Sequence, residues 1–454
     1  MYNNNQYSKR LHTVIPGGAH TYSRGDDQFP SNAPAILSRG HGAKVYDAEE
    51  NEFIDYGMGL RSVTVGYGYE SISQAAFRAI QMGNNLTRPT LLELEAAELL
   101  VNIIDGAEMV KFAKNGSNVT TAALKIARAY TNRKYVAICA EHPFFSFDDW
   151  FIGTTSIQRG IPLEHSGLTL KFHYNDIESL ERLFAEYPDQ IAAVMLEPVT
   201  TVSPCHSDCD TPNNAAGCAS CPRAGTTFLH QVQTLTKKNN AVFILDEMIS
   251  GFRWHKKGAQ HYFGVDPDIS TFGKAMANGF SLAAMAGKKD LMKLGSIDEA
   301  GAERLFLIST THGAEMCALG AFIETMKVYD TESVVDHIWA YGSRLIEMMN
   351  ATAVRHGVQD SFKVIGYPCS PTYMTLDGGG SSSFQFRTLF AQEMIRNGVM
   401  MPWIALSKAH DEKIFEQTTI AIDHALGIYK KALENGVENY LQGHAIKPVF
   451  RTHN

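Results

Sequence analysis

Short apolar runs alternate with amphipathic stretches through the middle of the chain. The runs at 134–140, 191–198 and 241–247 read KYVAICA, IAAVMLEP and AVFILDE, and each is apolar at most positions. Strands buried on both faces have this nearly continuous pattern, whereas NDIESLERLFAEY at 175–187 has the spacing of a helix. We therefore expect an α/β domain with a large, mainly parallel sheet between helices.

The two ends of the chain follow different patterns. KVYDAEENEFIDY at 44–56 alternates apolar and polar residues around a turn at 49–51, which predicts a hairpin. After about residue 325 helical patterns dominate, with one apolar stretch at 364–376. We expect residues 1–60 and 326–454 to build a second, smaller α+β domain, and residues 61–325 to form the larger one.

Composition narrows the partners of the protein. Its 454 residues carry 40 basic and 48 acidic side chains, a net charge of −8, which gives no positive field for nucleic acid or an anionic membrane. No run of eighteen apolar residues occurs, and the first residues do not have the pattern of a secretory leader. We expect a cytoplasmic protein that acts on small molecules.

Asp246 and Lys274 are the strongest chemical signal. Asp246 stands at the carboxyl end of the run 241–247, where open α/β sheets bind ligands, and Lys274 follows another apolar stretch, 269–272. A lysine beside such a crevice can form an imine with an aldehyde. Pyridoxal 5′-phosphate (PLP) is such an aldehyde, and it needs a buried carboxylate to keep its pyridine nitrogen protonated. Taken singly, a residue like Asp246 is more often a helix cap and one like Lys274 more often a surface lysine, so the hypothesis depends on the pair.

Gly116 and Ser117 are candidates for binding the phosphate of such a cofactor. They follow the apolar strand at 109–113 and open a helical stretch, so their backbone N–H groups lie at a helix N-terminus. An Asn-Gly-Ser sequence before a helix is also typical of an ordinary turn and cap. The interpretation depends on the presence of Lys274.

Four of the seven cysteines lie close together in the sequence. Cys205, Cys209, Cys218 and Cys221 form a C-x3-C and a C-x2-C pair, and four thiolates satisfy tetrahedral zinc. The residues between them include Pro, Asn and Gly and few apolar residues, so a metal would order a segment that has no core. The spacing predicts a structural zinc, and the alternative is a surface loop with free thiols or a disulfide formed on oxidation.

At these residues the chain resembles the class III (ω) PLP-dependent aminotransferases, on the branch that includes glutamate-1-semialdehyde 2,1-aminomutase. The resemblance runs from about residue 15 to 426. The matching stretches are IPGG at 15–18, RGHGAKVYDAEENEFIDY at 39–56, GAEMVKFAKNGSNVTTAALKIARAYT at 106–131, LEP at 196–198, LDEMISGFR at 245–253 and FGKAMANG at 272–279. The resemblance implies PLP-dependent transferase fold type I, with a sheet of the seven-stranded type.

The resemblance also implies roles for single residues around PLP. Lys274 becomes the Schiff-base lysine, and Asp246 the partner of the pyridine nitrogen. Gly116 and Ser117 become phosphate ligands. Met248 is expected on one face of the ring and an aromatic residue on the other, for which we choose Phe144 over His142 or Phe145.

Other roles concern the substrate and a partner subunit. The segment STTHGAE at 309–315 resembles one that reaches across a dimer, so Thr310 is expected to touch the neighbouring subunit's phosphate in a homodimer with shared sites. Arg24 stands where the aminomutase branch binds a substrate carboxylate, although an exposed loop arginine is the alternative. Glu197, in the matching Leu-Glu-Pro, is also expected to bind substrate.

These observations favour an aminotransferase that moves an amino group from an amine donor to a small carbonyl or keto acceptor. The reaction would run through an internal aldimine on Lys274, which also performs the proton shift, and through a pyridoxamine phosphate intermediate. The alternative is an intramolecular aminomutase, which needs a lid over its intermediate. The segment FIGTTSIQRGIP at 151–162 replaces the glycine-rich lid of the aminomutase, and the cysteine-containing segment is longer than its family counterpart. A third possibility, a binding module or scaffold without catalysis, does not explain why Lys274 and Asp246 occur together.

Overall fold

The computed structural model describes residues 4–142, 144–199, 202–205 and 226–454. The chain divides into two units: unit 1 comprises residues 1–69 and 336–451, and unit 2 comprises 70–335 with 452–454. Among the described residues, no helix combines the length and the apolar character needed to span a membrane.

Helices and strands alternate along most of unit 2. They are α3 (Glu70–Gln81), α4 (Leu91–Ile103), β4 (Met109–Ala113), α5 (Gly116–Thr131), β5 (Tyr135–Cys139), α6 (Asp149–Ile152), α7 (Leu163–Ser166), β6 (Thr169–Phe172), α8 (Ile177–Glu186), β7 (Ile191–Leu196), α10 (Phe228–Lys238), β8 (Val242–Asp246), α11 (Ala259–Phe263), β9 (Ile269–Phe272), the 3-10 turn η4 (Lys274–Ala277), β10 (Ala283–Gly287), α12 (Lys289–Met292) and α13 (Met316–Glu332).

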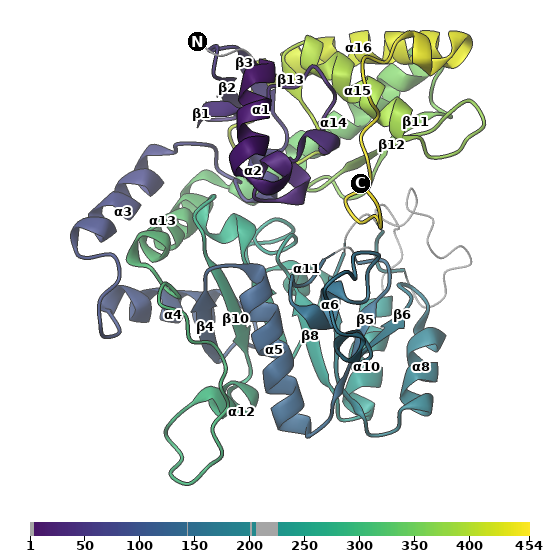
Figure 1. Ribbon diagram of the computed structural model, residues 1–454. Coiled ribbons are helices and arrows are strands. Elements are labelled where there is room, and N and C mark those ends of the chain that lie inside the picture. The colour runs from purple at the N-terminus through teal and green to yellow at the C-terminus, as the bar shows by residue number, and fades with distance from the viewer. Residues whose placement is uncertain (1–3, 143, 200–201, 206–225) are drawn as a thin grey trace. The chain divides into compact units, whose positions relative to one another are not determined.

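The strands of unit 2 form one seven-stranded sheet in the order β4-β10-β9-β8-β7-β5-β6 (Figure 1). Strands β6, β5, β7, β8 and β9 pair in parallel, and β10 is antiparallel to both of its neighbours, β9 and β4. Three of these strands, β5, β7 and β8, lie within the three predicted runs. The expected α/β fold with a mainly parallel sheet is therefore confirmed.

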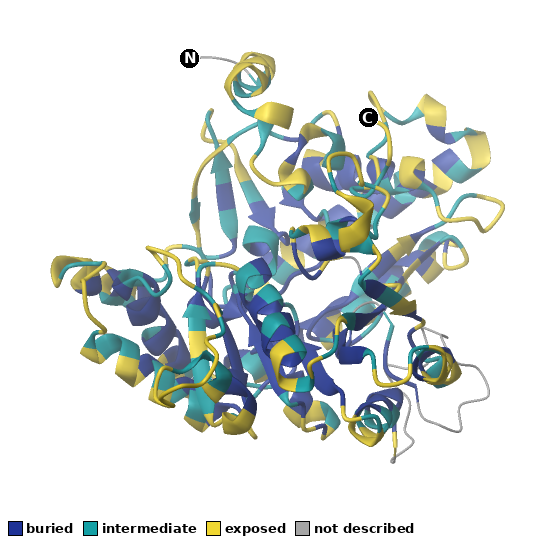
Figure 2. Cartoon of the chain, turned by 60° about the horizontal axis from the view of Figure 1, so that its bottom comes forward, coloured by how far each residue is buried: buried dark blue, intermediate teal, exposed yellow. Residues whose placement is uncertain are grey.

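Alternate residues of the parallel strands pack into two separate cores. Met195 and Ile244 belong to a cluster that includes the apolar face of α5, whereas Leu196 and Leu245 belong to a cluster with residues of α8 and α10. Figure 2 shows these strands buried and the outer faces of the flanking helices exposed. Helices on both faces explain why the strand sequences are continuously apolar.

Unit 1 is built from both ends of the chain. Its elements are α1 (Asn4–Val14), β1 (Leu37–His41), β2 (Lys44–Asp47), β3 (Glu52–Asp55), α2 (Met58–Arg61), α14 (Val334–His356, which begins at the unit border), β11 (Phe362–Ile365), β12 (Thr372–Thr375), α15 (Phe384–Arg396), β13 (Val399–Met400) and α16 (Glu412–Asn435). One sheet has the order β1-β2-β3-β13, and β11 and β12 form a separate antiparallel pair. The antiparallel pairing of β2 with β3 confirms the predicted hairpin.

The turn Met58–Arg61 has an uncommon left-handed backbone. Its four residues have φ angles of 39°, 58°, 61° and 68°, and only Gly59 among them lacks a Cβ. In the three residues with a Cβ, this conformation costs roughly 1–2 kcal/mol of free energy each, so other interactions must hold the turn. The buried carboxylate of Asp55 accepts hydrogen bonds from the backbone N–H groups of Gly57 (2.6 Å) and Met58 (3.1 Å), and from the hydroxyl of Tyr67 (2.6 Å).

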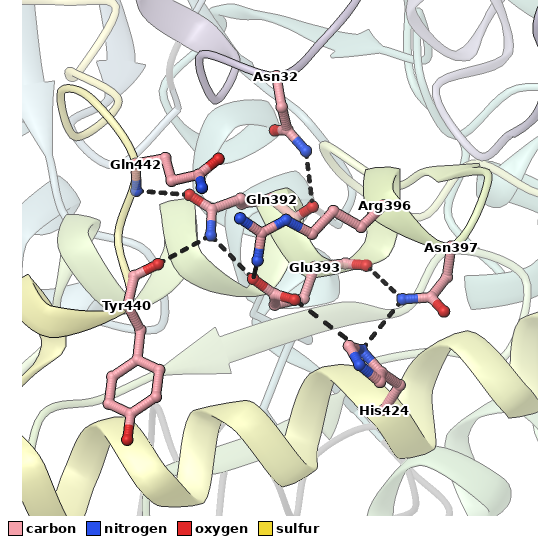
Figure 3. Close-up of polar contacts among 8 residues, drawn as sticks. All are labelled: Asn32, Gln392, Glu393, Arg396, Asn397, His424, Tyr440 and Gln442. Carbon is pink, nitrogen blue, oxygen red and sulfur yellow. Dashed lines mark hydrogen bonds and ion pairs between the residues drawn. The ribbon is translucent and has the colours of Figure 1, made fainter.

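A buried polar network joins the C-terminal segment to α15 (Figure 3). The side-chain amide of Gln392 donates to the carbonyl of Tyr440 (3.0 Å), and its oxygen accepts from the backbone N–H of Gln442 (2.7 Å). Gln392 also donates to the buried carboxylate of Glu393, which accepts a second bond from Arg396 (2.6 Å). These bonds connect the segment after α16 to α15 within unit 1.

Candidate active site

The candidate residues of unit 2 gather where its parallel strands end. Strand β8 ends at Asp246, β9 ends two residues before Lys274, and β4 ends three residues before Gly116. Because the carboxyl ends of these strands share one edge of the sheet, residues far apart in sequence come together there (Figure 1).

Asp246 is a buried carboxylate beside a lysine. Its Oδ1 accepts hydrogen bonds from the backbone N–H of Met248 (3.0 Å) and the hydroxyl of Thr271 (2.9 Å). Burial raises the pKa of Asp246 to about 6, and the positive charge of Lys274 opposes this rise. Lys274 itself has a φ of 37°, a left-handed conformation that is uncommon outside glycine and concentrates at functional sites. The structure therefore brings the two residues of the sequence hypothesis together.

Met248 is enclosed by two glycines from different loops. A Cβ added to Gly116 would lie 2.9 Å from the sulfur of Met248, and one added to Gly273 would lie 2.6 Å from it. Both distances are shorter than side chains tolerate, so these positions need glycine if Met248 is to stay in place. The loop before α5, the end of β8 and the turn before Lys274 consequently pack around one thioether.

The start of α5 provides an anion-binding helix terminus. Asn115 caps the helix by accepting the backbone N–H of Asn118 (3.2 Å), and α5 then continues for 16 residues. Ser117 is buried and its hydroxyl oxygen accepts the backbone N–H of Phe147 (3.0 Å). The hydroxyl proton of Ser117 can therefore be donated elsewhere, and unpaired N–H groups in the first turn favour a phosphate.

Three aromatic residues were candidates for the other ring face. Phe145 is 2% exposed and packs in the core on α5, where its carbonyl accepts the hydroxyl of Thr120 (2.8 Å). His142 is buried as well: its Nδ1 accepts the backbone N–H of Glu197 (3.0 Å), and burial lowers its pKa to about 3. Phe144 is 44% exposed and is the least buried of the three.

Glu197 and Glu247 are both buried at the edge where the strands end. The backbone of Glu197 is fixed by its bond to His142. Glu247 had no role predicted from the sequence, yet its carboxylate accepts the backbone N–H groups of Ala259 and Gln260 (2.7 Å each). Burial raises the pKa of Glu247 to about 7. Its position directly after Asp246 was the available signal, and its contacts fix the loop that follows β8.

Thr310 lies on an exposed stretch of unit 2 that ends at Glu315, the residue before α13. Its carbonyl accepts the backbone N–H of Gly313 (3.3 Å). Lys114, the residue before the N-cap of α5, forms an ion pair with Glu315. No local pattern in the sequence indicates this pair, because its two residues are 201 positions apart.

Arg24 belongs to unit 1 and is described with that unit alone. It lines a hollow of about 810 Å³, together with Tyr67 and Trp403. The left-handed turn contributes Gly59 and Leu60 to the same lining. An arginine in a hollow with aromatic walls is suited to an anionic organic ligand.

The predicted zinc ligands fall mostly outside the described residues. Cys205 is buried, and its backbone N–H donates to the side chain of Asn175 (2.8 Å). Cys209, Cys218 and Cys221 lie in the stretch 206–225, which the structure does not describe. Within the part of the chain that is described, no group of three or more His, Cys, Asp or Glu residues is placed to hold a metal.

The donor set at the sheet edge fits PLP. Lys274 offers an amine for the aldehyde, Asp246 a buried carboxylate for the ring nitrogen, and the start of α5 a site for the phosphate. Gly116 and Gly273 pack against the sulfur of Met248, and because they have no Cβ they leave room for it. These features come from different loops, and each matches one part of the cofactor.

Comparisons with known proteins agree with this fit. The aminotransferase class-III family model matches residues 27–370. The glutamate-1-semialdehyde 2,1-aminomutase of Natranaerobius thermophilus is 28% identical over 93% of this chain and 98% of its own length. The 3-aminobutyryl-CoA aminotransferase of Cloacimonas acidaminovorans is 29% identical over 92% of this chain and 95% of its own.

Solved structures share the fold. The FumI protein of a Sphingopyxis species, in its PLP internal aldimine form, has a TM-score of 0.82 at 24% identity and covers 95% of this chain and 97% of its own. A glutamate-1-semialdehyde-aminomutase from Pseudomonas aeruginosa has a TM-score of 0.78 at 18% identity, with 94% of each chain covered. These likenesses show fold type I, and the family model covers well over half of the sequence. The chain therefore belongs to the class-III aminotransferases and is a PLP-dependent enzyme.

Proposed function

We propose that this enzyme transfers an amino group from an amine donor to a small carbonyl or keto acceptor, with PLP held covalently by Lys274. The observation that carries the proposal is the buried carboxylate of Asp246 next to the charge of Lys274 and beside the enclosed Met248. Bound PLP supplies an electron sink that stabilises negative charge on the substrate carbon.

Each residue of the pair has a separate task. The Nζ of Lys274 holds the cofactor, and after its release it moves a proton at the substrate carbon. The carboxylate of Asp246 holds the proton of the ring nitrogen, which favours the charged form of Asp246 and offsets the effect of burial on its pKa. Glu247 acts at a distance by fixing the loop after β8.

The other site residues bind and position. Gly116 and Ser117 would hold the phosphate at the start of α5, and Met248 and Phe144 would lie against the two ring faces. Glu197 is proposed to face the substrate. Arg24 is proposed to bind a substrate carboxylate, which is supported by its place in the lining of the hollow in unit 1.

An intramolecular aminomutase is the second candidate, because relatives with that name match more than nine-tenths of the chain. A mutase needs a movable lid that retains its intermediate. The segment 151–162 that replaces the lid is anchored at its start: the indole of Trp150 donates to Thr121 (3.0 Å), its carbonyl accepts from Thr169, and the carbonyl of Thr154 accepts from Lys171. These bonds fix the start of the segment.

A homodimer is proposed for the assembly. Six large apolar side chains on and between α3 and α4 are 49–86% exposed, namely Phe77, Ile80, Met82, Leu86, Leu91 and Leu94. Both helices pack on α13, whose first N–H donates to the carbonyl of Asn84 (Figure 1). The apolar surface is thus connected to the segment that carries Thr310, and a surface of this kind is typical of an interface.

A cytoplasmic location stays a prediction.

Lys274 should be the only lysine that becomes labelled with cofactor. Borohydride treatment of the purified protein is expected to fix a pyridoxyl group on Lys274, found by peptide mass spectrometry. Lys274→Ala should lose this label and reduce turnover of amine donors by about three orders of magnitude or more. Lys111→Ala, in β4 of the same sheet, is the matched control. A label on another lysine would show that the assignment is wrong.

Asp246→Asn should keep part of the PLP but lose most activity. A neutral amide cannot hold the ring nitrogen protonated, so turnover is expected to fall by about two orders of magnitude or more. Thr271→Val is the control: it removes one bond to Asp246, worth about 1 kcal/mol, and should reduce turnover less than tenfold. Activity of Asp246→Asn near that of the parent would exclude Asp246 from the mechanism.

Thr310→Ala should weaken PLP binding by about 1 kcal/mol or more, roughly fivefold in Kd, if Thr310 serves the neighbouring subunit's phosphate. Titration of the cofactor-free dimer measures this affinity, and the adjacent Thr311→Ala is the control. A PLP-loaded monomer with full activity at low concentration would contradict the shared site.

The structural zinc of Cys205, Cys209, Cys218 and Cys221 remains a hypothesis that rests on their spacing. Metal analysis of protein purified without chelator or a metal-binding tag should find about one zinc per chain, and Cys218→Ser should lose it. Less than about a tenth of an equivalent in the parent protein would refute a zinc site.

A further inference from the structure

The ion pair of Lys114 and Glu315 connects two segments with separate tasks. Lys114 lies between the end of β4 and residues 115–117, named here the phosphate loop after the proposed binding of the cofactor's phosphate. Glu315 is the last residue of the segment that carries Thr310. The Nζ of Lys114 contacts Oε2 of Glu315, and their side chains are 30% and 19% exposed. A pair removed this far from water is screened less than a surface pair, and loss of one partner leaves the other charge poorly solvated.

Both partners are fixed at their backbones by further contacts. The carbonyl of Lys114 accepts the hydroxyl of Ser281 (2.8 Å), in the stretch that follows the Lys274 turn. On the other side, the N–H of Met316, directly after Glu315, donates to the carbonyl of Asn84 (3.0 Å). Helix α13 itself packs against the turn η4, which begins at Lys274. A movement of the backbone at Lys114 therefore affects the residues around Glu315, and a movement at Glu315 affects those around Lys114.

The neighbouring charges do not replace this contact. His312 lies 3.5 Å from the other oxygen of Glu315 and is charged only when protonated. Lys256 pairs with Asp330 in the same unit, but that pair joins the loop before α11 to the later part of α13. The Lys256 pair is comparable in chemistry and belongs to neither the phosphate loop nor the Thr310 segment.

We propose that the Lys114–Glu315 pair couples occupancy of the phosphate loop to formation of the dimer. Phosphate at Gly116 and Ser117 fixes the backbone next to Lys114, and the ion pair passes this order to Glu315 and to the Thr310 segment. Lys114 and Glu315 are positioning residues, and the inference rests on the proposed PLP site and homodimer. By linkage, whatever factor PLP contributes to dimer affinity, the dimer contributes to PLP affinity.

The test is a coupling factor, defined as the dimer Kd without PLP divided by the dimer Kd with saturating PLP. Sedimentation of the parent protein should give a factor of about ten or more, within the usual range for coupled sites. Lys114→Met and Glu315→Gln should each lower it to less than about two, and Lys114→Arg should retain it. The exchange Lys114→Glu with Glu315→Lys should restore most of it.

The control separates coupling from general stability. Lys256→Met, which breaks the comparison pair, is expected to leave the factor unchanged. A purely structural role of Lys114 and Glu315 would weaken the dimer with and without PLP alike and keep the ratio. A parent that binds PLP on Lys274 and dimerises, but whose factor is near one or survives both single substitutions, would overturn this inference and leave the proposed function intact. A parent that takes up no PLP would refute both.

Discussion

The burial of a carboxylate next to an ammonium group at the end of β8 is the interaction on which the rest of the site depends. Removing the charge of Asp246 from water is costly, and the N–H of Met248, the hydroxyl of Thr271 and the charge of Lys274 offset only part of that cost. A carboxylate whose pKa is raised to about 6 gains from a positive partner. The folded chain thus maintains a buried acid that a protonated ring nitrogen would stabilise.

Close packing around Asp246 determines where a protonated ring nitrogen can lie. Gly116 and Gly273 face the same sulfur, and the bonds of Glu247 to Ala259 and Gln260 hold the loop after β8. The site consequently depends on residues that position other groups and do not take part in the reaction themselves. Rigid support of this kind lets a few groups act on a bound molecule without reorganisation.

The sequence predicted the parts of the fold whose physical cause is local. Strands β5, β7 and β8 are buried on both faces, so their apolar runs were continuous, and the residues at their carboxyl ends led to Asp246. Strand β10 was not predicted, because four of the five residues of Ala283–Gly287 are Ala or Gly and its antiparallel pairing depends on distant partners. The ion pair of Lys114 with Glu315 was equally out of reach, since no local pattern joins residues so far apart in sequence. The left-handed turn at Met58–Arg61 is held by Asp55, and three of its four residues do not favour that conformation by themselves.

A crystal structure of the protein grown with PLP is the most direct test of the central claim. We expect continuous density from the Nζ of Lys274 to the cofactor, the ring nitrogen within about 3 Å of Asp246, and the phosphate at the N–H groups of Gly116 and Ser117. Cofactor bound elsewhere, or bound at the sheet edge with its ring nitrogen away from Asp246, would contradict the account.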